Sequence, residues 1–364
     1  MKLFLYADKK IKNFLPLTYL RSFSSLRLGF FKIKDYFKFL YPDWEIIEID
    51  KLPQNLEKGF YFLLRFLPKE KIKDLKDNFV FKYQDQIVGF YIKDDKEKKE
   101  MNIEGFLLDN LWDLIKCQKE FRPMWQPPFE NKEFIYEIPF KVYGKKDLVF
   151  LSKKAKIFGE LILNTEKGPI VIEDEVVLKG FNYFEGPCYL DKKTVVDSCK
   201  IRPFTTIGYA CRISGEIEAS VFLDFVNKHH EGFIGHSYIG SWVNFGAYTT
   251  NSDLKNNYSS VKIKIKNNVY DTKMLKFGCV IGDHTKTAIG SLIPTGAIFG
   301  ICVNIKKGGF CERFYPSFYW DKNKKWEFNK LIATIEKVMA RRGEKLNKEY
   351  RELLKRIYEK KRSI

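Results

Sequence analysis

The stretch IEDEVVLKGFNYFEGPCYLDKKTVVDSCKIRPFTTIGYACRI, residues 172–213, places large apolar residues six positions apart, with one slip of a single residue. A period of six matches neither the 3.6-residue turn of an α-helix nor the two-residue alternation of a half-buried strand. It is typical of a parallel β-helix, in which each hexad forms one flat face and three faces form a coil. The residues then expected to point into the axial core are Ile172, Leu178, Phe184, Leu190, Val196, Ile201, Ile207 and Ile213.

The same spacing returns further along the chain, so the repeat is expected to cover roughly residues 148–308. It resumes at Ile239 and Phe245, and again at Ile281, Ile293, Phe299 and Ile305. Glycine directly follows an apolar residue at several hexads, where the corner of a coil needs backbone angles that glycine tolerates best. An antiparallel sandwich with regular turns is the alternative, and the number of hexads in phase argues against it.

The regions on either side of the repeat differ in character. Residues 1–105 are predicted to form a small α/β domain, with strands at 3–6 and 44–49, a helix at 26–40 and a hairpin at 79–92. Residues 106–147 are predicted to be a helical connector, since prolines end the helical pattern of 107–121. Residues 326–364 carry apolar stripes at helical spacing. The predicted fold class is therefore mainly β, with a β-helix domain over 148–325 between the α/β part and C-terminal helices.

Charge and cysteine content limit the functional classes. The net charge is +18, but the lysines are scattered and no nucleic-acid-binding motif accompanies them, so we expect a lysine-rich surface that attracts anionic substrates rather than nucleic acid. The seven cysteines form no CxxC pair and are expected to be free, buried thiols of a cytoplasmic protein. No secretion signal or apolar run long enough to span a membrane is present, so no membrane association is expected.

Two aperiodic segments interrupt the repeat, and binding loops are expected there. Residues 224–233 contain Lys228, His229 and His230, and residues 249–272 contain Asn251. Histidine is the side chain best suited to proton transfer near neutral pH, and a neighbouring lysine suits a phosphate. The first segment therefore offers a general base together with a cation.

Several motifs together resemble the bacterial GlmU-like family. They are NKHHEGFIG at 227–235, IGSWVNFGA at 239–247, LKNNYS at 254–259, GDH at 282–284, PSFYW at 316–320 and, near the N-terminus, LPLTYLR at 15–21 and LRLG at 26–29. The resemblance covers roughly residues 3–325. It implies a left-handed β-helix, a homotrimer with active sites between subunits, and acetyl-CoA as co-substrate. The implied activity is acetylation of glucosamine 1-phosphate on the way to UDP-N-acetylglucosamine.

The resemblance also implies roles for individual residues. His230 matches the general base of the acetyltransferases, and Asn251 matches an asparagine near the acetyl donor. Positions expected near the coenzyme are Asp283, His284 and Gly300. Positions expected to bind the sugar phosphate are Lys228, Arg202, Glu231, Arg21 and Arg27. The implied transfer is direct, and it needs neither a metal nor a cysteine.

The N-terminal part departs from a working nucleotidyltransferase. Nucleotidyl transfer needs a glycine-rich loop or clustered cations around a triphosphate and carboxylates for Mg²⁺. No such loop is present, Ala7 precedes Asp8 where the family carries a second acidic residue, and Ser22 follows Arg21 where the family has proline. Sugar-1-phosphate nucleotidyltransferase activity, with Mg²⁺ as its cofactor, is therefore kept as an alternative to a domain that caps the solenoid.

Two further alternatives stay open. A carbonic anhydrase built on hexapeptide coils needs three histidines on one zinc ion, for which His230, His236 and His284 would be the candidates. A non-catalytic scaffold would use the solenoid only for assembly. Bound zinc favours the first alternative, and binding of coenzyme A argues against the second.

Overall fold

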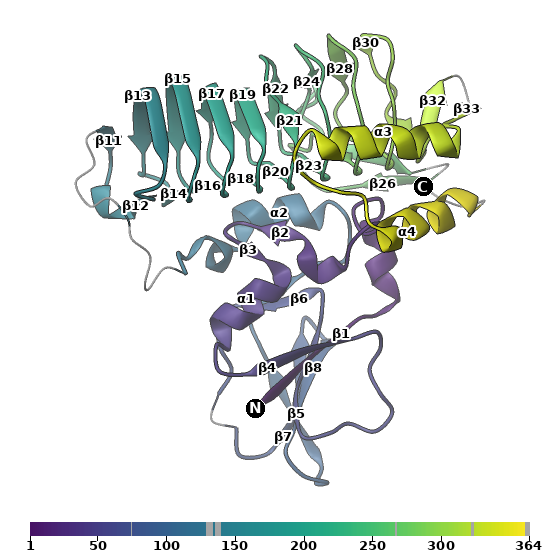
Figure 1. Ribbon diagram of the computed structural model, residues 1–364. Helices are drawn as coiled ribbons and strands as arrows, with labels where there is room; N and C mark the ends of the chain where they lie inside the picture. Colours follow the sequence, from purple (N-terminus) through teal and green to yellow (C-terminus); the bar gives the residue numbers. More distant parts are fainter. Residues whose placement is uncertain (74, 129–133, 135–139, 266–267, 322–323, 361–364) are drawn as a thin grey trace. The chain divides into compact units, whose positions relative to one another are not determined.

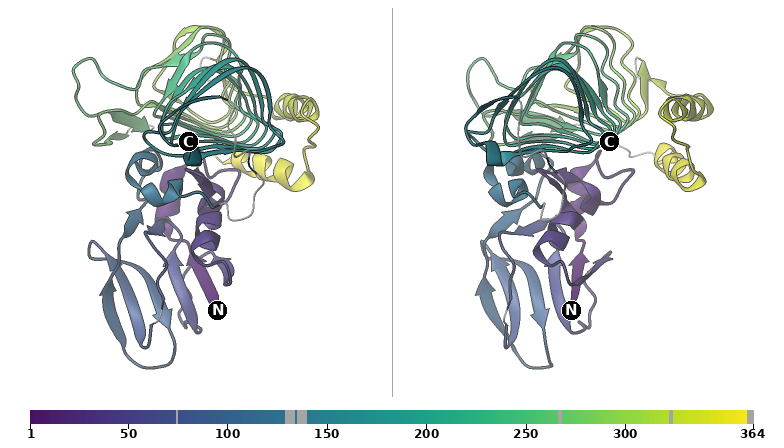
Figure 2. Two further views of the ribbon diagram at one scale, coloured as in Figure 1. Left: turned by 90° about the vertical axis from the view of Figure 1, so that its left-hand side faces the viewer. Right: turned by 60° about the vertical axis from the view of Figure 1, so that its left-hand side comes forward.

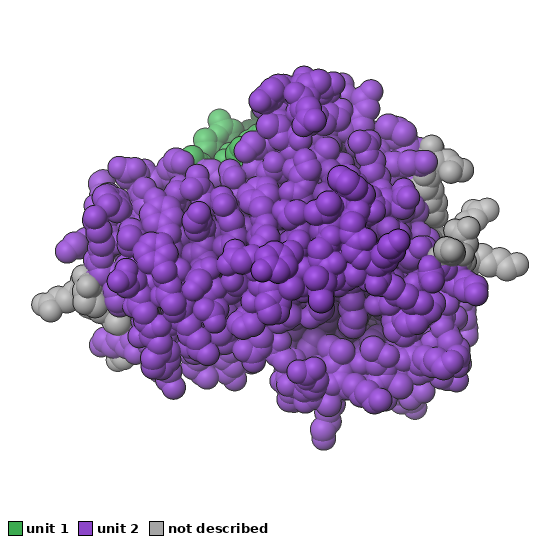
Figure 3. All heavy atoms as spheres, turned by 90° about the horizontal axis from the view of Figure 1, so that it is seen from above, with its two compact units in different colours: residues 1–14, 22–128 green, residues 15–21, 129–364 purple. Residues whose placement is uncertain are grey.

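The computed structural model describes residues 1–73, 75–128, 134, 140–265, 268–321 and 324–360. It divides into two compact units (Figures 1 and 3): the first holds residues 1–14 and 22–128, and the second holds residues 15–21 and 129–364. Strands make up 39% of the structure and helices 17%, which confirms the mainly β class. Residues 15–21, which the sequence assigned to the N-terminal domain, pack with the second unit.

The first unit is an α/β fold around a six-stranded sheet with the order β4-β1-β5-β8-β7-β9. The strands β4, β1 and β5 run parallel, and β8 pairs antiparallel with β5 and with β7. The bounds are β1 (Lys2–Tyr6), β4 (Glu45–Ile49), β5 (Gly59–Leu63), β7 (Asn78–Tyr83), β8 (Gln86–Ile92) and β9 (Lys98–Asn102), with β6 (Phe66–Pro68), β10 (Gly105–Leu107) and α2 (Asp113–Glu120) beside them.

The predicted helix over 26–40 is wrong in its first half. The structure has a short antiparallel pair, β2 (Arg27–Leu28) and β3 (Phe31–Lys32), and the helix α1 (Ile33–Leu40) begins only after it. Gly29 turns the chain between the two strands with φ +55°, and a Cβ there would lie 2.2 Å from the Met124 carbonyl oxygen. Glycine is therefore required at a turn that a helical pattern cannot reveal.

The second unit is a parallel β-solenoid, seen almost along its axis in Figure 2 as stacked triangular coils. One sheet contains β11 (Lys141–Tyr143), β13 (Lys156–Asn164), β15 (Val177–Glu185), β17 (Val195–Ile201), β19 (Arg212–Glu218), β21 (Asn227–Lys228) and β22 (Phe233–Gly235). The second contains β12 (Val149–Leu151), β14 (Ile170–Ile172), β16 (Cys188–Leu190), β18 (Thr205–Ile207), β20 (Val221–Phe222), β23 (Tyr238–Ile239), β27 (Cys279–Ile281), β29 (Ala297–Phe299) and β31 (Phe314–Tyr315). The third contains β24 (Thr250–Asn251), β28 (Ser291–Ile293) and β30 (Gly309–Phe310).

The axial core confirms the hexapeptide prediction. Every apolar residue that the six-residue spacing pointed inward is buried, and all of them belong to one contiguous cluster. The strand register stacks them in columns, as Leu178 lies opposite Val196 and Val196 opposite Ile213. Burial of this continuous column is the main favourable term that holds the coils together.

The coils bend at columns of residues with positive φ. The glycine corner lies within the long strands β15, β17 and β19 of the first sheet and continues along the third sheet. It contains Gly180, Ser198, Gly215, Gly232, Tyr248, Gly290 and Gly309. The aromatic corner follows the strands of the second sheet and contains Phe225, Trp242, His284, Cys302 and Phe318. These are different corners of the triangle, so side chains at the two corners of one chain face different surroundings.

Two additions complete the second unit. An excursion between β24 and β27 carries the antiparallel pair β25 (Lys262–Ile265) and β26 (Asn268–Asp271), inside the longer aperiodic segment. The helices α3 (Phe328–Ala340) and α4 (Lys348–Glu359) follow the strands β32 (Tyr319–Asp321) and β33 (Lys324–Lys325). They pack on the aromatic corner in an apolar cluster of Leu20, Ile301, Cys302, Phe318, Leu331, Ile332, Ile335, Leu354 and Ile357.

The cysteines are free as predicted, and six of the seven are buried. Among the residues that the structure describes, no helix is both long enough and apolar enough to cross a membrane.

Candidate functional site

His230 lines a small cavity at the glycine corner, which we name the histidine pocket. Its volume is about 270 Å³, and its lining is Asp197, Ser198, Ser214, His229, His230, Glu231, Ala247 and Tyr248. His230 itself is exposed, and it lies two residues before the Gly232 turn. The pocket therefore holds two adjacent imidazoles and two carboxylates, a set of groups able to accept and relay protons.

The two imidazoles differ in environment. The rings of His229 and His230 meet edge to face with centroids 5.9 Å apart. The Nδ1 atom of His229 is buried without a hydrogen-bond partner, and burial lowers the pKa of His229 while Asp197 opposes that shift. His229 therefore tends to stay neutral near physiological pH, and the exposed His230 is the ring that an incoming substrate can reach.

Lys228 does not face the histidine pocket. Its side chain is only 2% exposed, and Nζ donates to the carbonyl oxygens of Ser214 (2.8 Å) and His230 (2.7 Å). Burial lowers the pKa of Lys228 to about 8. The structure therefore places this predicted phosphate ligand inside the coil.

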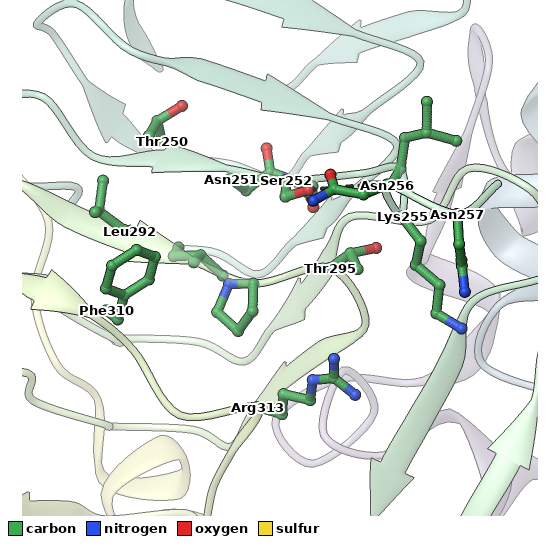
Figure 4. A pocket seen from close by; sticks show the side chains of 13 residues that line it. Thr250, Asn251, Ser252, Lys255, Asn256, Asn257, Leu292, Thr295, Phe310 and Arg313 are labelled. Atoms are coloured by element: carbon green, nitrogen blue, oxygen red, sulfur yellow. Dashed lines mark hydrogen bonds between the residues drawn. The ribbon is translucent and has the colours of Figure 1, made fainter. Parts of the chain in front are cut away.

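A larger cavity, which we name the basic pocket, lies where the excursion meets the third sheet. Its volume is about 690 Å³. Leu292 and Phe310 lie toward one end, Lys255 lies at the other beside Asn256 and Asn257, and Arg313 extends between the two ends below Thr295 (Figure 4). An elongated cavity with an apolar end and a cationic end suits a ligand that has an apolar arm and phosphates.

Asn251 lines the basic pocket, but its amide is already engaged. Oδ1 accepts from the Gly235 backbone N–H at 2.8 Å, and Nδ2 donates to the Gly235 carbonyl at 3.1 Å. The two contacts join the third sheet to β22. Asn251 and His230 thus line two different cavities of the chain, and Asn251 supports the wall of its own.

The predicted coenzyme residues Asp283, His284 and Gly300 lie at the aromatic corner and contact other parts of the second unit. Arg21 donates to Asp283 at 2.9 Å and to the Ser241 hydroxyl at 3.0 Å, and Asp283 is fully buried. The Nε2 atom of His284 lies 2.9 Å from the Tyr350 hydroxyl on α4. A Cβ at Gly300 would lie 2.4 Å from the Ser317 backbone nitrogen.

The other predicted substrate ligands are spread over the molecule. Glu231 is exposed and lines the histidine pocket. Arg202 pairs with Glu185 at 3.1 Å, and Arg27 in β2 is 6% exposed. Of the eight residues predicted besides Asn251 and His230, the structure therefore brings only Glu231 into the pocket that His230 lines.

In the first unit, Asp8 is held by a guanidinium. The Nε atom of Arg65 lies 3.0 Å from both carboxylate oxygens of Asp8, and Nη2 lies 2.8 Å from one of them. Arg65 also pairs with Asp109. Asp8 follows β1 at the carboxyl edge of the parallel strands, where α/β folds bind ligands. The guanidinium of Arg65 therefore lies between the carboxylates of Asp8 and Asp109.

The histidines considered for zinc do not gather in one chain. The Nδ1 atom of His236 lies 2.8 Å from Asp253, and both side chains are largely buried. His284 is held by Tyr350 at the aromatic corner, and His230 lies at the glycine corner. Among the described residues, no cluster of three histidine, cysteine or acidic side chains could hold a metal ion.

Sequence reasoning missed the cations of the basic pocket. Lys255 lies in the aperiodic segment 249–272, where binding loops are expected, so the sequence indicates its region. Arg313 lies beyond the last hexad, and it joins the pocket only because β30 stacks on β28. That contact depends on the register of the coils.

No protein-family model matches the chain. Among curated proteins, a bifunctional sugar-1-phosphate nucleotidylyltransferase/acetyltransferase of Sulfurisphaera tokodaii is 30% identical over 165 residues, which are 43% of this chain and 41% of that protein. The bifunctional protein GlmU of Methanocaldococcus jannaschii is 28% identical over 197 residues, 52% of this chain and 42% of that protein. The GlmU of Methanococcus vannielii is 38% identical over 82 residues, 22% of this chain and 20% of that protein.

The aligned part of the chain thus spans less than half the length of these relatives. Together with the solenoid, they confirm the resemblance to the GlmU-like family with its hexapeptide β-helix.

Proposed function

We propose that this GlmU-like chain is an acyltransferase that moves the acetyl group of acetyl-CoA to the 2-amino group of glucosamine 1-phosphate, a step of UDP-N-acetylglucosamine biosynthesis. The observation that carries the proposal is the exposed imidazole of His230 in a cavity at a corner of a hexapeptide solenoid. Sequence similarity to bifunctional acetyltransferases supports the reaction class.

The proposed mechanism is direct transfer with His230 as general base. His230 takes a proton from the 2-amino group as the amine attacks the thioester carbonyl, and the C–S bond then breaks to release the coenzyme A thiol. A positioned base of this kind contributes roughly 10²- to 10⁴-fold to the rate. Asp197, His229 and Glu231 line the same cavity as the His230 ring.

We assign acetyl-CoA to the basic pocket rather than to the aromatic corner. Lys255 and Arg313 supply positive charge for the coenzyme phosphates, and Leu292 and Phe310 supply apolar surface for its pantetheine arm. At the aromatic corner, Asp283 and His284 are buried against protein partners, whereas Lys255 is partly exposed. Asn251 stabilises the wall of this pocket, because its side-chain amide is hydrogen-bonded to the main chain of Gly235.

The proposal includes a homotrimer. A ridge of exposed apolar side chains, which we name the apolar ridge, follows the glycine corner: Phe158, Phe181, Tyr248, Ile289 and Phe310 are between 49% and 91% exposed. Large exposed apolar patches mark association sites. The histidine pocket adjoins this ridge, so a neighbouring chain packed on it could bring its own acyl donor to His230.

The test uses the full chain with acetyl-CoA and glucosamine 1-phosphate, and it follows free thiol and the acetylated sugar. We expect thiol release that depends on the amino sugar. Absence of amino-sugar-dependent release, with coenzyme A still bound, would move the search to another acceptor. Absence of coenzyme A binding would favour a non-catalytic scaffold.

Nucleotidyl transfer is the second candidate, since the relatives are named as bifunctional. The contact of Arg65 with Asp8 and Asp109 argues against a Mg²⁺ site at that position. Adding UTP, Mg²⁺ and N-acetylglucosamine 1-phosphate to the same protein tests it. Release of pyrophosphate would assign this activity to the chain.

A further inference from the structure

A lysine occupies an inward position in the apolar column of the solenoid. The register places Leu178 opposite Val196, Val196 opposite Ile213, and Ile213 opposite Lys228. Three coils therefore fill this column with apolar side chains, and the coil that carries the two histidines fills it with a cation. A buried lysine is costly unless its ammonium group finds hydrogen-bond acceptors.

The acceptors are main-chain carbonyls on two successive coils. The Nζ atom donates to Ser214 on the preceding coil and to His230 on its own, at 2.8 and 2.7 Å. Gly215 makes room for this arrangement, because a Cβ there would lie 2.8 Å from Nζ, and its φ is +81°. The lysine thus ties the histidine segment to a rigid neighbouring coil.

We propose that Lys228 is a positioning residue for His230, holding the main chain of residues 228–232 so that the imidazole faces the histidine pocket. The inference rests on the proposed function for its effect on catalysis, but the tie itself does not. The alternative role in binding the sugar phosphate is opposed by the burial of Lys228 and by the two carbonyls that Nζ contacts.

A positioning role accounts for a residue that breaks the pattern of the core. Departures from the core pattern are expected at functional sites, where their cost is offset by function. A displacement of a catalytic group by about 1 Å can lower a rate by roughly 100-fold. The ammonium group links the His230 carbonyl to the Ser214 carbonyl on the preceding coil, and this link limits such displacement.

The test compares Lys228→Met with Lys228→Gln in the full chain. Methionine matches the apolar column and removes both hydrogen bonds, whereas glutamine retains an N–H donor one atom shorter than the ammonium. We expect kcat to fall about 10- to 100-fold in Lys228→Met with KM for acetyl-CoA unchanged, and to recover in part in Lys228→Gln. Because methionine fits the column, we expect the thermal stability to be retained while kcat falls. A merely structural role of Lys228 would instead lower thermal stability together with kcat.

Amide hydrogen exchange separates this inference from the proposed function. In Lys228→Met, exchange is expected to accelerate in residues 229–232 and to stay unchanged in the coil that contains Val196. If the wild-type protein transfers no acetyl group, the proposed function fails, and exchange alone decides about the tie. Unchanged exchange at 229–232, or kcat within twofold of wild type where acetyl transfer is observed, would overturn the inference.

Discussion

At the scale of single residues, the buried charges of the second unit are tied to specific partners. Lys228 carries its charge in the axial core, and burial lowers its pKa from 10.5 to about 8. Between these two pH values the unfolded chain keeps a proton that the folded chain releases. Stability contributed by this residue therefore rises with pH through that window, since the unfolded state binds more protons.

This pKa shift predicts that the difference in the free energy of unfolding between the wild type and Lys228→Met depends on pH. The charged lysine costs the folded state roughly 3 kcal/mol at pH 7, at about 1.4 kcal/mol for each pKa unit, and less than about 1 kcal/mol at pH 10. From pH 7 to pH 10, the wild type is expected to gain about 2 to 3 kcal/mol of folding stability relative to the variant. Chemical denaturation at both pH values measures this change. A difference that does not change with pH would contradict the burial of Lys228.

The sequence predicts that Arg21 binds the sugar phosphate, but its ion pair with Asp283 indicates a role in folding stability. Removing one partner of a buried ion pair costs roughly 3–5 kcal/mol, because the other charge stays buried. Arg21→Ala is therefore expected to lose stability, and the double variant Arg21→Ala with Asp283→Asn to regain part of it. A stable Arg21→Ala with a raised KM for the sugar phosphate would restore the predicted ligand role.

At the scale of elements, the excursion between β24 and β27 forms one wall of the basic pocket, and the third sheet lines the rest. Its base is fastened by the contact of His236 with Asp253 and by the hydrogen bond from the Phe277 N–H to the Asp253 carbonyl. Lys255 in turn donates to Ser259 and Ser260 within the excursion. Lys255 is thus presented by an element that the coil anchors, whereas Arg313 reaches the pocket from the chain after β30.

Removing the cations of the basic pocket is expected to weaken binding of acetyl-CoA and to leave the acetyl-transfer step little changed. Arg313→Ala combined with Lys255→Ala is expected to raise KM for acetyl-CoA roughly tenfold with little change in kcat, since charge-assisted hydrogen bonds to phosphate contribute about 1.5–3 kcal/mol each before compensation. Steady-state kinetics checks this, with Lys273→Ala on the exposed excursion as control. An unchanged KM would place the coenzyme elsewhere.

The repeat and its surroundings differ in how far the sequence predicts them. Each inward residue from Ile172 to Ile305 follows a local spacing, so the core of the solenoid could be predicted without knowledge of long-range contacts. The hairpin at Gly29 and the contact of Arg21 with Asp283 depend on residues about 95 and 262 positions away. The same holds for the burial of Lys228, whose inward direction follows from strand register and not from residue type.

At the scale of the whole molecule, the predicted site residues are dispersed, and the two predicted catalytic residues, His230 and Asn251, line different cavities of the second unit. His230 lies at the glycine corner, and the residues that the sequence predicts near the coenzyme lie at the aromatic corner. An active site shared between copies would reconcile a base in one cavity with a donor in another, as the proposed trimer requires.

The apolar ridge predicts that association depends on its side chains. Phe158→Glu or Phe181→Glu is expected to shift the protein from trimer to monomer and to lower the activity per chain. Sedimentation velocity measures the shift, and Val269→Glu serves as control, because Val269 is 62% exposed but lies on the excursion. Trimers that persist in both ridge variants would exclude this interface.

The most direct test of the account is the rate of thiol release from acetyl-CoA, at saturating glucosamine 1-phosphate, for the wild type and for His230→Ala. We predict a fall of roughly 10²- to 10⁴-fold in kcat with an intact fold, as expected for loss of a general base. A His230→Ala variant that releases thiol at the wild-type rate would contradict the assignment of the histidine pocket as the catalytic centre.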